Sequence, residues 1–190
     1  MKRLIILLFL FLIPNIGNAQ ESVNSVKPDK YDTIFKDLTF ENDELFWVDV
    51  KALCLVETTT LSNTATSSKN AKGVCQILPA TFKEVVKQTK RKNYHIRNPE
   101  HNIRIAAKYL EILYRRWGES MQNVESDEGE EDQLKLALAS YNAGYGRVRK
   151  AMRKCNGTNF NTIKRCLPSQ TVAYVRKVNI QRAELYSIDV

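Results

Sequence analysis

The sequence has few of the residues that bind metal ions. It contains only two histidines, His95 and His101, and none of its four cysteines lies in a C-x-x-C pair. A zinc site needs Cys or His ligands at close spacings, so the sequence argues against one, and we expect neither metal nor cofactor. The chain also lacks internal repeats.

Long apolar runs are also absent, apart from one at the N-terminus. Lys2 and Arg3 precede the apolar residues 4–13, and the small residues of Gly17-Asn18-Ala19 follow them. This layout is typical of a secretory signal peptide (residues 1–19) that is cleaved after Ala19. Ten apolar residues are too few to span a bilayer comfortably, although an uncleaved anchor is the alternative. No cysteine near the cleavage site could carry a lipid. We therefore expect an exported protein of the bacterial periplasm or cell envelope, without a membrane anchor after cleavage.

Positive charge exceeds negative charge along the chain. The formal net charge is +8, and removal of Lys2 and Arg3 with the signal peptide leaves 27 − 21 = +6. A basic exported protein has the anionic polymers of the cell envelope as natural partners. The run 87–92 contains four basic residues that could contact phosphates, but no nucleic-acid-binding motif surrounds it. We expect no nucleic-acid partner.

The four cysteines indicate disulfide bonds, because an exported chain with an even number of cysteines usually forms them. Cys155 and Cys166 bracket a short loop in which Asn156-Gly157 allows the chain to turn back, so we predict that they pair. Cys54 with Cys75 is the complementary pair. Two buried thiols acting as small apolar side chains are the alternative for this second pair.

The spacing of apolar residues predicts a single, mostly α-helical domain at 42–188, preceded by a flexible lead at 20–41. We expect helices over residues 42–58, from Pro79, over 98–118, from 134 until Gly144 and Gly146 break the helix, over 148–152, and over 171–186. Residues 58–72 are expected to form an irregular loop. Residues 119–132 are acidic and poor in apolar side chains, and residues 125–132 are predicted to form an exposed, mobile loop. We expect deletion of residues 123–132 to leave folding unharmed.

Glu57 is the most informative single residue. It follows Val50, Leu53 and Cys54 at spacings of seven, four and three, which places it on the apolar face of its helix. Burial and the nearby helix C-terminus both disfavour a negative charge, so the pKa of Glu57 is expected to be raised. A carboxylic acid that is still protonated near neutral pH can act as a general acid. A partly exposed glutamate at a frayed helix end is the alternative.

Five short motifs support the functional interpretation. In order they are Glu57-Thr58, then GVCQILPAT at 73–81, then NPEHNI at 98–103, ALASYNAG at 137–144 and YVRKV at 174–178. Their order and spacing resemble the soluble lytic transglycosylase family, which carries E-S, G-L-M-Q-x-x-P-x-T, D-P-x-x-N-I, A-Y-N-A-G and Y-V-x-x-V. The resemblance covers roughly residues 45–186. Each motif alone is weak, but five in this order are a strong signal.

The resemblance implies a lysozyme-like helical fold with a substrate cleft over Glu57. It also implies cleavage of the MurNAc–GlcNAc β-1,4 bond of peptidoglycan glycan strands. Glu57 would protonate the glycosidic oxygen, and its carboxylate would then deprotonate the MurNAc 6-hydroxyl, which closes on C1 to give a 1,6-anhydro sugar. Most glycosidases need a second carboxylate. Residues 58–83 contain no Asp or Glu, which favours this lyase reaction.

The resemblance further implies a set of substrate-binding positions around Glu57. Thr58 replaces a serine of the family, Leu78 replaces a common methionine of the cleft wall, and Gln170 replaces a glutamate. The loop before Gly73 is one residue longer than usual, which makes the match of Ser67 less secure. Cys75 also replaces a methionine. For Tyr141 and Tyr174, packing in the core is an equally good explanation. The substrate-binding candidates are Thr58, Ser67, Gln76, Leu78, Tyr141, Asn142, Gln170 and Tyr174.

Two other functions remain open from the sequence. A hydrolytic muramidase on the same fold would leave a reducing end instead of an anhydro sugar. An inactive peptidoglycan-binding assembly protein would not cleave the polymer, although Glu57, Gln76 and Asn142 argue against it. A small exported enzyme without a binding module also suggests a local task with a secretion, conjugation or lysis apparatus as partner.

Overall fold

The computed structural model describes residues 31–40, 43–120 and 127–188, and within these ranges its regular secondary structure is helical. Two isolated β-bridges, Thr66 with Lys72 and Lys72 with Ile77, lie in the loop between α2 and α3. The prediction of a mostly α-helical domain is thus confirmed. The elements are α1 (Asp32–Lys36), α2 (Trp47–Glu57), α3 (Pro79–Gln88), α4 (Pro99–Ser120), α5 (Asp127–Ala143), α6 (Tyr145–Cys155), α7 (Phe160–Ile163), the 3-10 helix η1 (Lys164–Cys166) and α8 (Ser169–Ile188).

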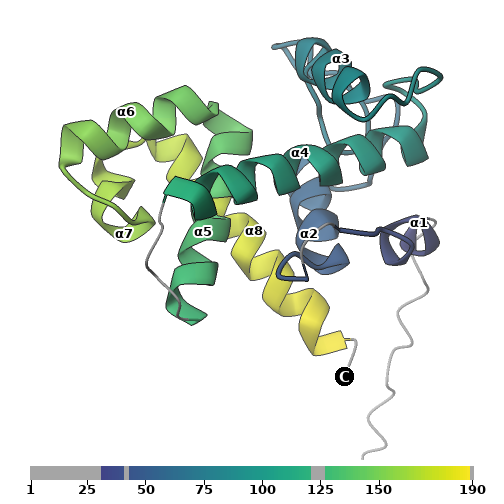
Figure 1. Ribbon diagram of the computed structural model, residues 1–190. Coiled ribbons are helices and arrows are strands. Elements are labelled where there is room, and N and C mark those ends of the chain that lie inside the picture. Colours follow the sequence, from purple (N-terminus) through teal and green to yellow (C-terminus); the bar gives the residue numbers. More distant parts are fainter. Residues whose placement is uncertain (1–30, 41–42, 121–126, 189–190) are drawn as a thin grey trace, which may run out of the picture.

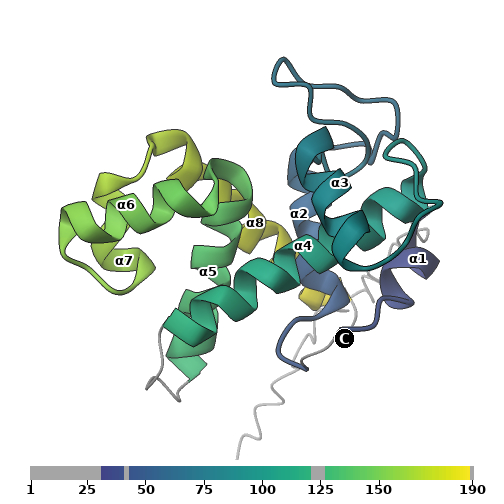
Figure 2. The same ribbon diagram turned by 45° about the horizontal axis from the view of Figure 1, so that its top comes forward.

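The long helix α4 crosses the molecule and connects two groups of helices (Figure 1). One group contains α1, α2 and α3, and the other contains α6 and α7; α5 and α8 lie between them. The same arrangement is visible after rotation, where the loop after α2 rises beside α3 (Figure 2). The most extensive contact between elements joins α2 to α8, and the next joins α4 to α5.

Helix α2 is the central helix of the core. All residues from Val48 to Cys54 are buried, including the charged Asp49 and Lys51. A buried charge needs a partner, and each of these has one. Lys51 Nζ lies 2.5 Å from Asp32 Oδ1 of α1, and Asp49 Oδ1 lies 2.6 Å from Arg182 Nε of α8.

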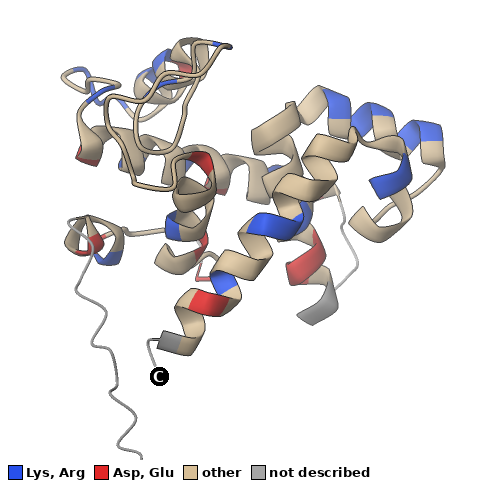
Figure 3. Ribbon diagram, turned by 180° about the vertical axis from the view of Figure 1, so that it is seen from behind, with Lys and Arg blue, Asp and Glu red and all other residues tan. Residues whose placement is uncertain are grey.

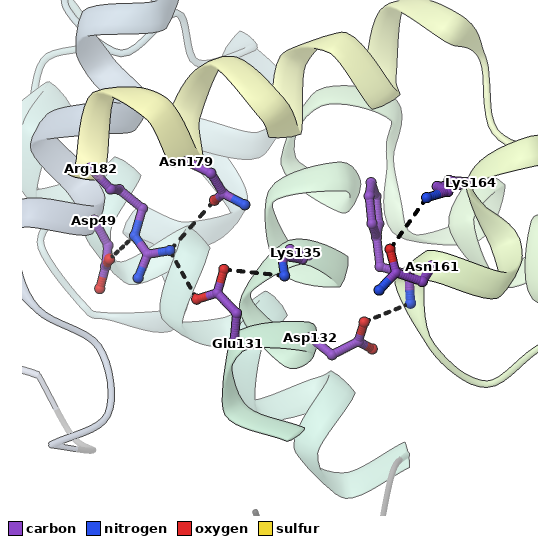
Figure 4. Close-up of polar contacts among 9 residues, drawn as sticks. Asp49, Glu131, Asp132, Lys135, Asn161, Lys164, Asn179 and Arg182 are labelled. Carbon is purple, nitrogen blue, oxygen red and sulfur yellow. Dashed lines mark hydrogen bonds and ion pairs between the residues drawn. The ribbon is translucent and has the colours of Figure 1, made fainter. Parts of the chain in front are cut away.

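Arg182 joins three helices through its guanidinium group. Besides Asp49 of α2, it contacts Glu131 Oε2 of α5 at 3.1 Å, and Glu131 also contacts Lys135 Nζ at 3.3 Å (Figure 4). Burial raises the pKa of Asp49, while Arg182 opposes that increase. The network therefore compensates a carboxylate that would otherwise be costly to bury.

The predicted loop at 125–132 is helical over its described residues, 127–132, so the prediction was wrong there. Helix α4 continues through Gly118 to Ser120, and α5 begins at Asp127; residues 121–126 lie outside the described residues. Glu131 binds Arg182, and Asp132 Oδ1 accepts a hydrogen bond of 2.8 Å from Phe160 N at the start of α7. These partners lie far away in the sequence. Through them, two acidic side chains that the sequence suggested to be solvent-exposed take part in contacts between helices.

Two boundaries near the N-terminus also differ from the predictions. Helix α2 begins at Trp47, not near residue 42, and Asp49 Oδ2 accepts a 2.8 Å hydrogen bond from the backbone N of Phe46, which precedes the helix. Residues 31–40, predicted to belong to a flexible lead, contain α1, whose Phe35 is fully buried. The rest of the lead and the signal peptide lie outside the described residues.

Both predicted disulfide bonds are present. Cys54 is bonded to Cys75, and Cys155 at the end of α6 is bonded to Cys166 at the end of η1. The segment between Cys155 and Cys166, predicted as a loop, contains α7 and η1. Gly144, with φ +88°, separates α5 from α6 as predicted, while Gly146 lies inside α6. Within the described residues no helix is long and apolar enough to cross a membrane.

Candidate functional site

Glu57 is the last residue of α2 and is partly buried. Burial raises the pKa of its carboxyl from 4.5 to about 7, and interaction with the Tyr174 hydroxyl opposes this increase. The direction agrees with the prediction from its place on the apolar face. Near neutral pH the group therefore exists in both protonation states, which suits an acid that later acts as a base.

Two tyrosine hydroxyls lie close enough to Glu57 to sense its charge. Burial and the Glu57 carboxylate together raise the pKa of Tyr141 and of Tyr174 well above the usual value, so both remain protonated donors. Tyr141 Oη donates a 2.8 Å hydrogen bond to Cys75 O. Tyr174 Oη is buried and makes no hydrogen bond of normal geometry. It is thus a hydroxyl beside Glu57 whose donor is not committed elsewhere.

The loop between α2 and α3 is held against the end of α2 by backbone and side-chain bonds. Thr58 Oγ1 donates a 2.6 Å hydrogen bond to Val74 O, directly after Glu57. Gln76 adopts a left-handed backbone conformation with φ +47°, and its Nε2 donates to Gly73 O at 2.9 Å. For a residue other than glycine such a conformation costs about 1 kcal/mol, and it often occurs at functional sites.

Asn102 is the residue that organises this loop, and the sequence analysis did not single it out. Its side chain is fully buried; Oδ1 accepts a 2.8 Å hydrogen bond from Cys75 N, and Nδ2 donates to Lys72 O at 3.0 Å and Ile96 O at 2.8 Å. Gly73 lies against it with φ +79°, and a Cβ there would lie 2.5 Å from Nδ2. A signal did exist, because Asn102 is the second asparagine of the NPEHNI motif at 98–103.

The Cys54–Cys75 disulfide connects the same loop covalently to α2. Cys54 lies three residues before Glu57, and Cys75 lies next to Gln76 and accepts the Tyr141 hydrogen bond. The bridge, Asn102 and Tyr141 thus all converge on one residue of the loop. This arrangement fixes the loop relative to the Glu57 carboxyl.

All four remaining predicted site residues lie exposed on the surface, and one of them, Asn142, is held by a hydrogen bond from another helix. Asn142 is exposed, and its Oδ1 accepts a 3.0 Å hydrogen bond from Thr171 Oγ1, a second residue that the sequence analysis missed. This bond leaves the Asn142 amide nitrogen free to donate. Ser67, Leu78 and Gln170 are exposed. Ser67 Oγ instead accepts from Ala71 N at 3.1 Å.

Metal ligands are not gathered at this site. Among the described residues, no three side chains of His, Cys, Asp or Glu are grouped so as to hold a metal ion. The chemistry available at the site is therefore that of one carboxyl group of raised pKa, surrounding hydroxyl and amide groups, and a fixed loop.

Comparison with known proteins identifies the family. The Transglycosylase SLT domain matches residues 42–164, which include Glu57, the loop after α2 and the end of α5. The chain belongs to this family. No curated protein gives a significant sequence match.

Solved structures of soluble lytic transglycosylases share the fold. The 70-kDa enzyme from Escherichia coli is 27% identical with a TM-score of 0.65 over 80% of this chain. The complex of the 70-kDa soluble lytic transglycosylase with bulgecin A gives 25% identity and a TM-score of 0.66 over 84%. An inactive Glu-to-Gln mutant of Slt from Pseudomonas aeruginosa gives 25% and 0.58 over 75%. The matches cover only 23%, 24% and 21% of those chains.

Proposed function

We propose that this protein is a peptidoglycan lytic transglycosylase in which Glu57 acts first as acid and then as base. The observation that carries the proposal is a single partly buried carboxyl group with a pKa of about 7, placed beside two tyrosine hydroxyls. Membership of the SLT family supports peptidoglycan as the substrate.

The reaction requires one group to transfer a proton twice. Protonated Glu57 donates its proton to the glycosidic oxygen between MurNAc and GlcNAc, and the bond from C1 to that oxygen breaks. The resulting carboxylate removes the proton from the MurNAc 6-hydroxyl, whose oxygen forms a bond to C1. Glu57 ends the cycle protonated, the product is a 1,6-anhydro sugar, and no water is consumed. A pKa near 7 makes both steps accessible at neutral pH.

The surroundings of Glu57 favour this lyase reaction over hydrolysis by a muramidase. Burial and Tyr174 account for the pKa of Glu57, and no carboxylate of the described residues is among the causes of its shift. The loop residues 58–83 contain no Asp or Glu. A two-carboxylate glycosidase places its acidic groups within about 10 Å of each other. A single acid is sufficient when the substrate's own hydroxyl is the nucleophile.

The relatives agree with a role for glutamate. The Pseudomonas aeruginosa Slt in the comparison is described as an inactive mutant in which Gln replaces Glu. The corresponding test here is Glu57→Gln, which keeps the shape of the side chain and removes its acidic proton.

The neighbouring residues receive supporting roles in this proposal. Tyr174, with its uncommitted hydroxyl, stabilises the Glu57 carboxylate after proton transfer. The Asn142 amide nitrogen, oriented by Thr171, donates to the sugar. Gln76 and Thr58 shape the loop next to Glu57 and contribute their polar groups to sugar binding. The exposed Ser67, Leu78 and Gln170 are left as contacts with more distant parts of the glycan or its peptide.

We also infer that the protein acts outside the cytoplasm, in the periplasm or cell envelope. Two disulfide bonds require an oxidising compartment, and peptidoglycan lies there. A link to a secretion, conjugation or lysis apparatus stays a prediction from the sequence.

Mass spectrometry of the fragments released from purified sacculi tests the reaction. We expect 1,6-anhydroMurNAc ends from the mature protein, and Glu57→Gln should reduce their release at least 100-fold. Glu119→Gln, an exposed position near the end of α4, is the matched control and should retain full activity. Reducing MurNAc ends would indicate a muramidase. Binding without any cleavage would indicate the inactive assembly protein.

A further inference from the structure

The positive charge of this protein is concentrated in its C-terminal third. From Gln133 to Ala183 the sequence contains no Asp or Glu but eleven basic residues. Seen from behind, blue segments recur along α6 and on α8 (Figure 3). The basic residues are Lys135, Arg147, Arg149, Lys150, Arg153, Lys154, Lys164, Arg165, Arg176, Lys177 and Arg182.

Two adjoining hollows lie between α8 and the α7–η1 segment, on the outer side of α8. Their volumes are about 430 and 640 Å³, and they share Lys164, Val172, Arg176 and Ile180. Val172, Arg176 and Ile180 follow one another at intervals of four, so they occupy one face of α8. We call the two hollows together the α8 groove.

The floor of the α8 groove is apolar. Val172, Val175 and Leu167 line it, and Ile180 is 49% exposed there, one of few large apolar side chains so exposed among the described residues. Ile180 extends the apolar floor to the solvent, where the apolar side chains of a partner would cover it.

The rim of the groove carries charge of one sign. Its charged lining residues are Lys135, Lys164, Arg165, Arg176 and Lys177, and no described carboxylate lines it. Lys135 pairs with Glu131, whereas Arg176 and Lys177 are exposed and form no ion pair with a described carboxylate. These two cations are therefore available to a bound anion.

The α8 groove is separate from the candidate catalytic site. Tyr174 and Val178 are buried on the opposite side of α8, toward Glu57 and the core. Near its start, however, the groove includes Ser169, two residues before Thr171, which orients Asn142. A molecule held in the groove would thus lie next to the enzyme's substrate without occupying the site.

We propose that the α8 groove binds an acidic amphipathic helix of a partner protein. The apolar floor requires an apolar stripe, and the cationic rim requires carboxylates beside it, a combination that one helix presents on adjacent faces. A polyanion such as nucleic acid would pair with the rim but leave the floor exposed to water. A flat bilayer would not enter the hollow.

Fluorescence anisotropy with a designed probe tests this proposal on the full mature protein. The probe is a fluorescein-labelled 18-residue helix with Leu at positions i, i+3, i+4 and i+7 and Glu on the flanks. A scrambled peptide of the same composition is the control probe. We expect the ordered probe to bind, Arg176→Gln/Lys177→Gln to weaken it about tenfold, and Ile180→Asp to abolish it. Lys150→Gln/Lys154→Gln, which removes the same charge from exposed positions on α6, should change binding less than twofold.

Several results would overturn the proposal. Equal binding of the scrambled peptide, or equal weakening by the α6 double variant, would mean attraction to any polyanion. Absence of peptide binding together with capture on phosphatidylglycerol vesicles, or concentration-dependent dimerisation that Ile180→Asp prevents, would assign the groove to a membrane or to a second copy. Cleavage of sacculi by the groove variants should equal that of the parent. Loss of that cleavage would make the groove part of the substrate site, independently of whether Glu57 is the acid.

Discussion

Replacing Glu57 by glutamine should stabilise the protein at alkaline pH, because the fold holds this carboxyl where its charge is unfavourable. The pKa of Glu57 is about 7 in the folded state, whereas the ordinary pKa of a glutamate is 4.5. Above pH 7 the difference corresponds to about 3 kcal/mol of lost folding free energy. Below pH 4.5 both states are protonated and the penalty vanishes.

The sign follows from proton binding. Between pH 4.5 and 7 the folded protein holds a proton that the unfolded chain has released, so the stability of the parent falls as pH rises through this window. Glutamine carries no ionisable proton, so the variant escapes this decline. The difference between variant and parent is therefore expected to grow from near zero at pH 4.5 to about 3 kcal/mol at pH 8.

Urea denaturation of both proteins with intact disulfides, followed by far-UV circular dichroism at several pH values, measures this difference. At pH 8 the midpoint of Glu57→Gln should exceed that of the parent by about 1 M, given a typical urea dependence of 2–3 kcal/mol per M. Glu119→Gln serves as the control for a change of charge alone. Equal midpoints for Glu57→Gln and parent at pH 8 would refute the conclusion that Glu57 is buried and has a raised pKa.

Three further predictions concern the scaffold. Arg182→Met should lower the free energy of unfolding by about 3 kcal/mol, measured by heat or urea, because it leaves Asp49 buried without its partner. Asp49→Asn in the same chain should recover part of that loss. An unchanged stability of Arg182→Met would contradict a stabilising role for this ion-pair network. Asn102→Ala should cost about 3 kcal/mol and reduce sacculus cleavage, since it removes two hydrogen bonds to the loop beside Glu57 and a third to Ile96 O. Unchanged cleavage would show that the loop needs no such support. Replacing Cys155 and its partner by serine should lower the free energy of unfolding by about 3 kcal/mol while leaving cleavage of sacculi unchanged. A loss of cleavage measured below the melting temperature would show that this disulfide bond supports the catalytic site.

Much of the fold could be predicted because local signals were strong. The apolar spacing of α4 and the proline at its start both indicated the helix, and Gly144 marked the junction of α5 and α6. Glu57 was recognisable as unusual because a carboxylate on an apolar helix face is seldom without cause. Its neighbours Tyr141 and Tyr174 followed from the motif resemblance, and the structure places both beside it.

What the sequence could not reveal depends on contacts between distant residues. Glu131 and Asp132 look like members of a solvated acidic loop until Arg182 and the backbone of Phe160 are brought to them. Phe35 lies in a polar stretch whose burial only the packing of α1 against the core discloses. Thr171 could not be connected to Asn142, because the two residues share no local pattern.

The close approach of Gly73 to Asn102 constrains how this family member can change over time. A Cβ at residue 73 would overlap the Asn102 amide, and the positive φ disfavours a side chain independently. Shortening Asn102 would make room, but it would leave Cys75 N and Ile96 O without a partner and would remove one of the two hydrogen bonds to Lys72 O. Neither position can therefore vary first without harming the loop beside Glu57. A single substitution at either residue of this pair is therefore unfavourable. The exposed Ser67, a few residues away, can be substituted without this cost and can thus adapt to a different glycan.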